Sequence, residues 1–353
     1  MRVLVSHFGD MNEIIHSSPR EIANVEGFSK RLALEVTHFF KAPQFGDAVE
    51  EAEQQLKELD KIGGRILTWW DSGFPDLLKK IYDPPAYLFV RGSFFPSDAY
   101  AIAIVGTRTP SNYAISMAER FSREIASKGI TVISGLARGI DTVAHQAALK
   151  AGGRTIAVIG SGLDWIYPPE NKSLVEKIVE RGVLVSEFAM GAKPDAMNFP
   201  KRNRIVSGMS LGTLIVETDI NGGAMITATT ALDQNREVFA IPGNVGGKRS
   251  RGANHLIKSG RAKLVESLDD IIAELQVKLR PILGKDPEEE GRPLPELTLF
   301  EQRILELLDD IPRHIDAISE TSSLSISDSL VNLLNLEFKG LIKQLPGKMF
   351  IRN

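Results

Sequence analysis

Residues 101–270 repeat one pattern: an apolar run, a glycine turn and a helix-forming segment. In the first unit the apolar run 101–105 stops at Gly106, and residues 113–128 follow with helical spacing. Similar apolar runs return at residues 131–135, 155–162, 183–187, 213–217 and 237–243. This alternation predicts parallel strands joined by right-handed crossover helices. Because the strands are apolar on both faces, helices must cover both faces, and we predict a doubly wound α/β domain.

The carboxyl ends of the strands decide what such a sheet binds, because ligands there meet glycine turns and helix N-termini. Glycine lets the backbone approach a ligand closely, and free backbone N–H groups favour an anion. Cationic residues follow these turns at Gly106-Thr107-Arg108, at residues 134–139 and at residues 199–204. The first turn matches neither the dinucleotide fingerprint nor the P-loop pattern. We therefore predict a phosphate-binding pocket of another kind.

Composition narrows the chemistry of this pocket. The chain has no cysteine, and its six histidines lack ligand spacing, so we expect no disulfide, no thiol catalysis, no metal and no cofactor. No apolar run approaches the roughly 20 residues that span a bilayer, and no signal peptide is recognised. We expect a cytoplasmic protein without a membrane partner.

The net charge is −3, but residues 101–275 hold 21 lysines and arginines against 17 acidic residues. The α/β domain is therefore mildly basic.

Residues 1–64 predict a small helical domain. Two helices, at residues 21–25 and 30–40, flank a turn that contains Gly27. The turn fits two alternatives. It could belong to a SAM-like or helix-hairpin-helix unit that binds a phosphate, or it could simply connect two helices of a bundle; the single glycine favours the bundle. An acidic helix follows at residues 47–59, and residues 65–70 and 85–90 read as strands, the second as a candidate edge of the main sheet.

The carboxyl-terminal part divides at a proline-rich, acidic stretch. After the α/β domain at residues 65–278, residues 279–296 have no apolar periodicity and predict a linker. Residues 297–353 predict a winged helix, with three helices and a terminal hairpin. The third helix, at residues 327–338, has no lysine or arginine, so it would gain little from DNA phosphates. A protein-contact or regulatory role is favoured over duplex binding.

Lys201, Arg202 and Arg204 form the most unusual charge cluster. They are expected at the start of a helix over residues 201–209, where the helix dipole penalises cations. A bound polyanion would relieve this cost, and Phe199 could stack on a base. A solvated charge cluster beside a core phenylalanine is the alternative.

Two further groups leave alternatives open. Asp141 and His145 are four residues apart on a predicted helix, as in a general base held by a carboxylate, but no nucleophile accompanies them and a structural role is favoured. The cations Lys248, Arg249 and Arg251 follow a glycine-rich loop and form either a second anion contact or an ordinary flexible loop.

The ordered motifs of the chain resemble those of the DNA processing protein A family (DprA, also called Smf). The similar stretches are residues 105–108, 134–141, 160–168, 171–172, 199–205, 223–228, 236–243 and 252–257. The resemblance covers nearly the whole chain. It implies an extended Rossmann-like, mostly parallel sheet between a helical domain and a winged helix. It also implies a non-enzymatic homodimer that binds and protects incoming single-stranded DNA and loads RecA recombinase in natural transformation.

The candidate DNA contacts are residues that match the family's motifs or that lie at the carboxyl ends of the predicted strands. They are Gly106, Thr107, Arg108, Gly135, Lys172, Phe199, Lys201, Arg202, Asn203 and Arg204. Thr107 stands where the family often has serine, and it keeps the hydroxyl. No catalytic residue is assigned.

Two other functions fit the same fold. Nucleotide-binding enzymes that cleave N-glycosidic bonds carry a proline-glycine-glycine loop, which Pro242-Gly243-Asn244 does not reproduce. The third possibility is a scaffold whose pocket holds a small regulatory nucleotide.

Overall fold

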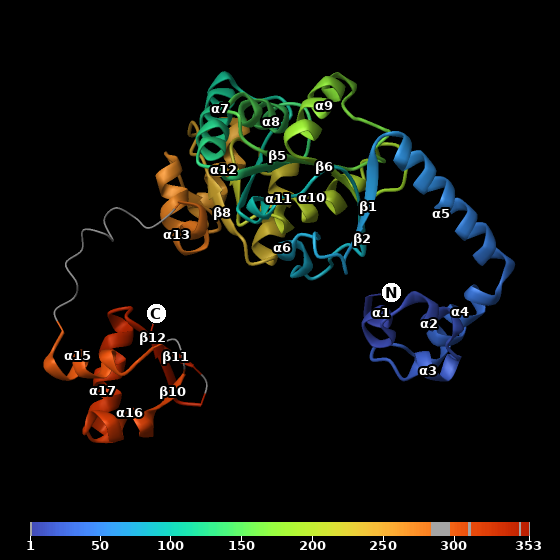
Figure 1. Ribbon diagram of the computed structural model, residues 1–353. Helices are drawn as coiled ribbons and strands as arrows, with labels where there is room; N and C mark the ends of the chain where they lie inside the picture. Colours follow the sequence, from blue (N-terminus) through green and yellow to red (C-terminus); the bar gives the residue numbers. More distant parts are fainter. Residues whose placement is uncertain (1, 284–296, 310–311, 346, 353) are drawn as a thin grey trace. The chain divides into compact units, whose positions relative to one another are not determined.

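The computed structural model describes residues 2–283, 297–309, 312–345 and 347–352 (Figure 1). The chain divides into two compact units, residues 1–283 and 284–353. Among the described helices, none is long and apolar enough to cross a membrane. Most of the predicted linker, residues 284–296, lies outside the described residues.

A nine-stranded sheet forms the centre of the first unit, in the order β1-β2-β6-β5-β4-β3-β7-β8-β9. The strands from β3 to β9 pair in parallel, and β1 and β2 are antiparallel. Their bounds are β1 (Gly64–Thr68), β2 (Tyr87–Gly92), β3 (Ala101–Val105), β4 (Thr131–Ser134), β5 (Thr155–Ile159), β6 (Val183–Ser186), β7 (Gly212–Ile215), β8 (Glu237–Ala240) and β9 (Lys263–Leu264). The predicted mostly parallel α/β sheet is confirmed.

Helices cover both faces of this sheet (Figure 1). They are α6 (Asp76–Lys79), α7 (Asn112–Ser127), α8 (Ile140–Lys150), α9 (Lys172–Arg181), α10 (Asn198–Gly208), α11 (Gly223–Asp233), α12 (Arg251–Lys258) and α13 (Leu268–Leu283). Alternate residues of β3 face opposite layers, as strand geometry requires. Ala101 and Ala103 pack with α10, α11 and α12, and Ile102 and Ile104 pack with α7, α8 and α13. The sheet is therefore covered on both faces, so a ligand can reach it only at the ends of its strands or at its edges.

Three sequence expectations are corrected. Strand β2 is not an edge, because it lies between β1 and β6, and its residues Leu88 and Phe89 are buried on opposite faces. The predicted boundary at residues 278/279 falls inside α13, because Leu279 anchors the last turn in the core despite Pro281. Helix α10 begins at Asn198 rather than at residue 201, since proline is tolerated in a first helical turn.

The amino-terminal residues form a helical cluster with its own core. Its helices are α1 (Arg2–Phe8), α2 (Met11–His16), α3 (Pro19–Ala23) and α4 (Lys30–Lys41), and α5 (Pro43–Lys61) follows them and packs its buried Leu59 against the main sheet. The buried side chains include Leu4, Ile14 and Ile22. Gly27 has a φ of +82°, which suits a turn between α3 and α4. The predicted helical domain is present.

The second unit is a winged helix. It contains α15 (Leu299–Glu306), β10 (Arg313–His314), α16 (Ile315–Ser322), α17 (Ile326–Phe338), β11 (Ile342–Leu345) and β12 (Met349–Arg352). Its strands pair in the order β10-β12-β11 around a separate small core. The exposed side of α17 is largely apolar: it carries Leu330, Leu334 and Phe338 beside a few polar residues such as Asp328 and Asn335. This surface lacks the cations that a DNA-reading helix uses.

Candidate nucleic-acid interface

A groove follows the carboxyl edge of the sheet, where β3, β4 and β7 meet the first turns of α10 and α11. It continues past the ends of β5 and into the loop before α9, because Arg108 and Phe199 line all three adjoining pockets. The groove contains Gly106, Thr107, Arg108, Gly135, Phe199, Arg202 and Asn203 on one side and Lys172 at its far end. The structure thus brings together eight of the ten predicted contacts.

The Gly106 turn is fixed by its own backbone. Thr107 N–H donates to the Glu217 carbonyl (2.7 Å), and the Thr107 carbonyl accepts from Ile140 N–H (3.2 Å). A Cβ on Gly106 would lie 2.6 Å from the Ile140 side chain, so only glycine fits between β3, β7 and α8. The carboxylate of Glu217 accepts from Ser111, which caps α7. This rigid turn presents Arg108 to the groove.

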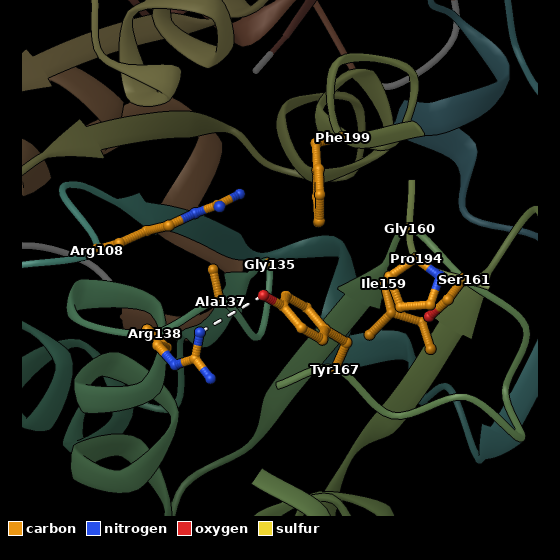
Figure 2. Close-up of a pocket in the computed structure, with 10 residues that line it drawn as sticks. All are labelled: Arg108, Gly135, Ala137, Arg138, Ile159, Gly160, Ser161, Tyr167, Pro194 and Phe199. Atoms are coloured by element: carbon orange, nitrogen blue, oxygen red, sulfur yellow. Dashed lines mark hydrogen bonds between the residues drawn. The ribbon is translucent and has the colours of Figure 1, made fainter. Parts of the chain in front are cut away.

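Arg108 is the exposed cation at the centre of the groove. Its guanidinium lies 4.9 Å from the ring centroid of Phe199, which projects from the first turn of α10 (Figure 2). Within the described residues, no carboxylate pairs with Arg108. A cation without a counter-ion and a half-buried aromatic ring therefore face the same space, which suits a phosphate and a base.

Arg202 is buried rather than exposed. Its Nη1 donates to the Val158 carbonyl at 2.6 Å, and the side chain lies beside the buried carboxylate of Asp141. Burial lowers the pKa of Arg202 to about 10 and raises the pKa of Asp141. Gly135 is required here, because a Cβ would overlap the Arg202 guanidinium. The guanidinium of Arg202 interacts with Asp141 inside the protein, and its buried Nε has no hydrogen-bond partner among the described residues.

Arg204 is balanced internally. Its guanidinium contacts both carboxylate oxygens of Glu187 and donates to the Asp83 carbonyl at 2.7 Å. Because α10 starts at Asn198, Arg202 and Arg204 also lie beyond its first turn, where the dipole penalty is smaller. The expected electrostatic anomaly is thus relieved by acidic partners, and no bound polyanion is needed to explain the cluster.

The remaining predicted contacts differ in position. Lys172 is exposed at the start of α9, and Asn203 is half-buried in the groove. Lys201 is exposed on α10, but it does not line the groove. The second cationic cluster, Lys248, Arg249 and Arg251, also does not line the groove. Its Arg251 pairs with Asp219 at 3.0 Å.

The structure gives Asp141 and His145 separate structural roles. The Nδ1 atom of His145 lies 2.6 Å from the Thr155 hydroxyl, and Asp141 accepts from Ala137 N–H at 3.3 Å. Burial lowers the pKa of His145 to about 3, so the ring is neutral at pH 7. Neither group fits the general-base alternative. Within the described ranges, no group of three metal-ligating side chains is found.

Several groove residues were missed by the sequence reasoning. Trp165, Tyr167 and Lys193 line the part of the groove nearest α9. Arg138 pairs with Glu170 at 2.6 Å and lies 5.6 Å from the Tyr167 ring (Figure 2). The Tyr167-Pro168 corner was visible in the sequence. Nothing in the sequence indicates that Trp165 is exposed or that Lys193 lies beside it.

Comparisons with known proteins agree with this architecture. Residues 65–276 match the family model for DNA recombination-mediator protein A, and residues 288–348 match the DprA winged helix domain. Protein Smf of Escherichia coli is 38% identical over 304 residues, which cover 84% of this chain and 79% of that protein.

Two solved structures are similar as well. One is DNA processing protein A from Streptococcus pneumoniae, with a TM-score of 0.65 and 32% identity, covering 77% of this chain and 91% of that one. The other, from Helicobacter pylori, describes a single-stranded DNA binding mode of that protein. It has a TM-score of 0.55 and 29% identity, covering 61% of this chain and 96% of that one. The chain therefore belongs to the DNA recombination-mediator protein A family, whose members are also named DprA and Smf.

Proposed function

We propose that this chain binds single-stranded DNA in the groove at the carboxyl edge of its sheet. The observation that carries the proposal is the position of Arg108, an exposed cation without an acidic partner in the described structure, 4.9 Å from the Phe199 ring. A backbone phosphate pairs with Arg108, and a base stacks on Phe199. The single-stranded DNA binding described for the Helicobacter pylori relative supports the same ligand class.

The groove neutralises only a few phosphates. Arg108, Lys172 and Lys193 are its exposed cations without acidic partners among the described residues, whereas Arg204 pairs with Glu187 and Arg202 is buried near Asp141. We therefore assign DNA contact to Gly106, Thr107, Arg108, Gly135, Lys172, Phe199 and Asn203, with Lys201 as a peripheral contact. Arg202 and Arg204 support the fold of α10. Binding should be sequence-tolerant and salt-dependent.

Tight binding by so small a site needs two linked copies, so we propose a homodimer that presents two grooves to one strand. Exposed apolar side chains near the free edge of the sheet, Ile220, Val245 and Leu264, offer a surface for such pairing. By its family, we infer that the chain acts in the cytoplasm, protects incoming DNA and loads RecA in natural transformation.

We do not propose catalysis in this groove. Its described carboxylates are engaged. Asp141 is buried near Arg202, Asp219 pairs with Arg251, and Asp164 accepts from Gly191 N–H. An N-glycosidic hydrolase would need a free acid or base close to the ligand. Release of a free base from nucleoside monophosphates by the purified protein would overturn this assignment.

The proposal is tested with fluorescence anisotropy of labelled oligo-dT and of a matched duplex over a range of salt concentrations. We expect preference for the single strand and a slope of log K against log salt of about −2 for one groove, because each phosphate contributes roughly −0.7. Equal affinity for duplex, or binding unchanged by salt, would contradict it. RecA loading is tested separately, by the rate at which RecA replaces a single-strand binding protein on DNA.

A further inference from the structure

We propose that Trp165, with Lys193, forms a second base-stacking subsite that extends the DNA path from Phe199 toward α9. The inference rests on the proposed single-strand binding and adds to it the direction of the strand and a further contact. Trp165 and Lys193 line the pocket that shares Arg108, Tyr167 and Phe199 with the central groove. A strand leaving Phe199 in this direction meets a second exposed ring.

The Trp165 ring is held outward by a rigid loop. Trp165 N–H donates to the Gly162 carbonyl at 2.9 Å, and the Ser161 hydroxyl donates to the Trp165 carbonyl at 2.6 Å. The backbone is thus fixed, yet the residue is 43% exposed. Folding leaves this part of a large apolar side chain in contact with solvent, so a stacking ligand would gain by covering it.

A second loop brings a cation to the same place. Gly162 N–H donates to the Ala192 carbonyl at 2.8 Å, and both carboxylate oxygens of Asp164 accept from Gly191 N–H. These bonds tie the two loops together and hold the Lys193 ammonium 5.5 Å from the Trp165 ring. Asp164 is the acidic group of this pocket, and its contact with Gly191 partly balances its charge.

Lys193 and Lys172 complete the subsite. Within the described part of the chain, neither ammonium pairs with a carboxylate, and both line the pocket beside Trp165. An exposed ring flanked by cations fits the repeating unit of single-stranded DNA, in which each base is followed by a phosphate. Tyr167 lines both this pocket and the adjoining pocket that contains Phe199. Its hydroxyl points toward Arg138 (Figure 2).

The first test is binding of labelled oligo-dT to Trp165→Ala, Trp165→Phe and Trp70→Ala. Trp70 is a matched control, since it is 40% exposed and does not line the groove. We expect Trp165→Ala to weaken binding about tenfold, Trp165→Phe to retain most of the affinity, and Trp70→Ala to match wild type. An abasic oligomer of equal length, which offers phosphates without bases, should bind Trp165→Ala and wild type equally.

The second test uses intrinsic fluorescence. The chain has three tryptophans, and only Trp165 lines the groove, so oligo-dT should quench wild type and leave Trp165→Phe unquenched. The proposed subsite would be refuted if Trp165→Ala bound oligo-dT as tightly as the wild type does and if oligo-dT did not quench the fluorescence of the wild type. If Arg108→Ala still weakened binding in that case, the proposed function would stand. Failure of wild type to bind any oligonucleotide would instead refute the proposed function.

Discussion

Replacing Arg202 by methionine separates a structural role from a DNA contact. The substitution removes the hydrogen bond to Val158 and leaves the carboxylate of Asp141 buried without its cation. Removing one partner of a directly paired buried salt bridge costs about 3–5 kcal/mol, and this is an upper bound here because no ion pair within 4 Å joins Arg202 to Asp141 among the described residues. We therefore expect the free energy of unfolding of Arg202→Met to fall by about 2–4 kcal/mol, from the lost Val158 hydrogen bond and the lost attraction to Asp141. The double variant Arg202→Met/Asp141→Asn should recover roughly half of the loss, since no buried charge remains.

The pH dependence has a definite sign. Without Arg202, the pKa of Asp141 rises further above its ordinary value, so between the unfolded and folded pKa values the folded state keeps a proton that the unfolded state releases. Stability then decreases as the pH rises between the unfolded and folded pKa values. The loss caused by Arg202→Met should therefore shrink as the pH falls toward 4, the ordinary range of an aspartate.

Urea unfolding followed by tryptophan fluorescence is the suitable assay. Trp69, Trp70 and Trp165 all belong to the first unit, so the signal is not mixed with unfolding of the winged helix. At low urea, the folded variant should bind oligo-dT within about threefold of wild type, because the lost charge is buried near Asp141. A loss of stability below 1 kcal/mol together with a large loss of binding would refute the structural role of Arg202.

Three further perturbations follow from the structure. Gly135→Ala places a methyl group against the Arg202 guanidinium and should cost about 1–3 kcal/mol in urea unfolding, less in an Arg202→Met background. Burial lowers the pKa of His145 to about 3, so the unfolded state binds a proton before the folded state does as the pH falls. Acidification from pH 6.5 to 3 should therefore lower the free energy of unfolding of the wild type by roughly 4 kcal/mol, and this loss should be absent in His145→Gln. Chemical unfolding across this pH range measures the difference. Deleting residues 297–353 should leave the affinity for oligo-dT within about twofold of the wild-type value, because α17 carries no lysine or arginine to contact phosphates. A large loss of affinity would instead indicate that the winged helix contacts DNA.

Local patterns in the sequence were sufficient to predict the main sheet. The apolar runs that became β3 to β8 were identified because parallel strands buried on both faces are continuous apolar segments. Strand β9 was missed, since its two residues, Lys263 and Leu264, are exposed and carry no apolar run. The inner position of β2 was missed because its pairing with β6 joins segments far apart in the sequence.

The candidate site was predictable in part. The turn with Arg108 and the segment with Phe199 both follow strand ends, so their meeting follows from the topology of the sheet. The pairing of Arg204 with Glu187 could not be predicted, because charge balance depends on side-chain positions that no local pattern encodes. The same limit applies to Arg202, whose burial near Asp141 changes a predicted ligand contact into a structural residue.

The affinity of Arg108→Ala for oligo-dT, compared with that of Arg123→Ala, tests the central claim most directly. Arg123 is an exposed arginine on α7 outside the groove, so both variants lose one surface charge. We predict that Arg108→Ala weakens binding about 10- to 100-fold and makes the salt slope smaller in magnitude by roughly 0.7. Arg123→Ala should bind like wild type. Equal affinities for the two variants, with both folded, would contradict DNA binding in this groove.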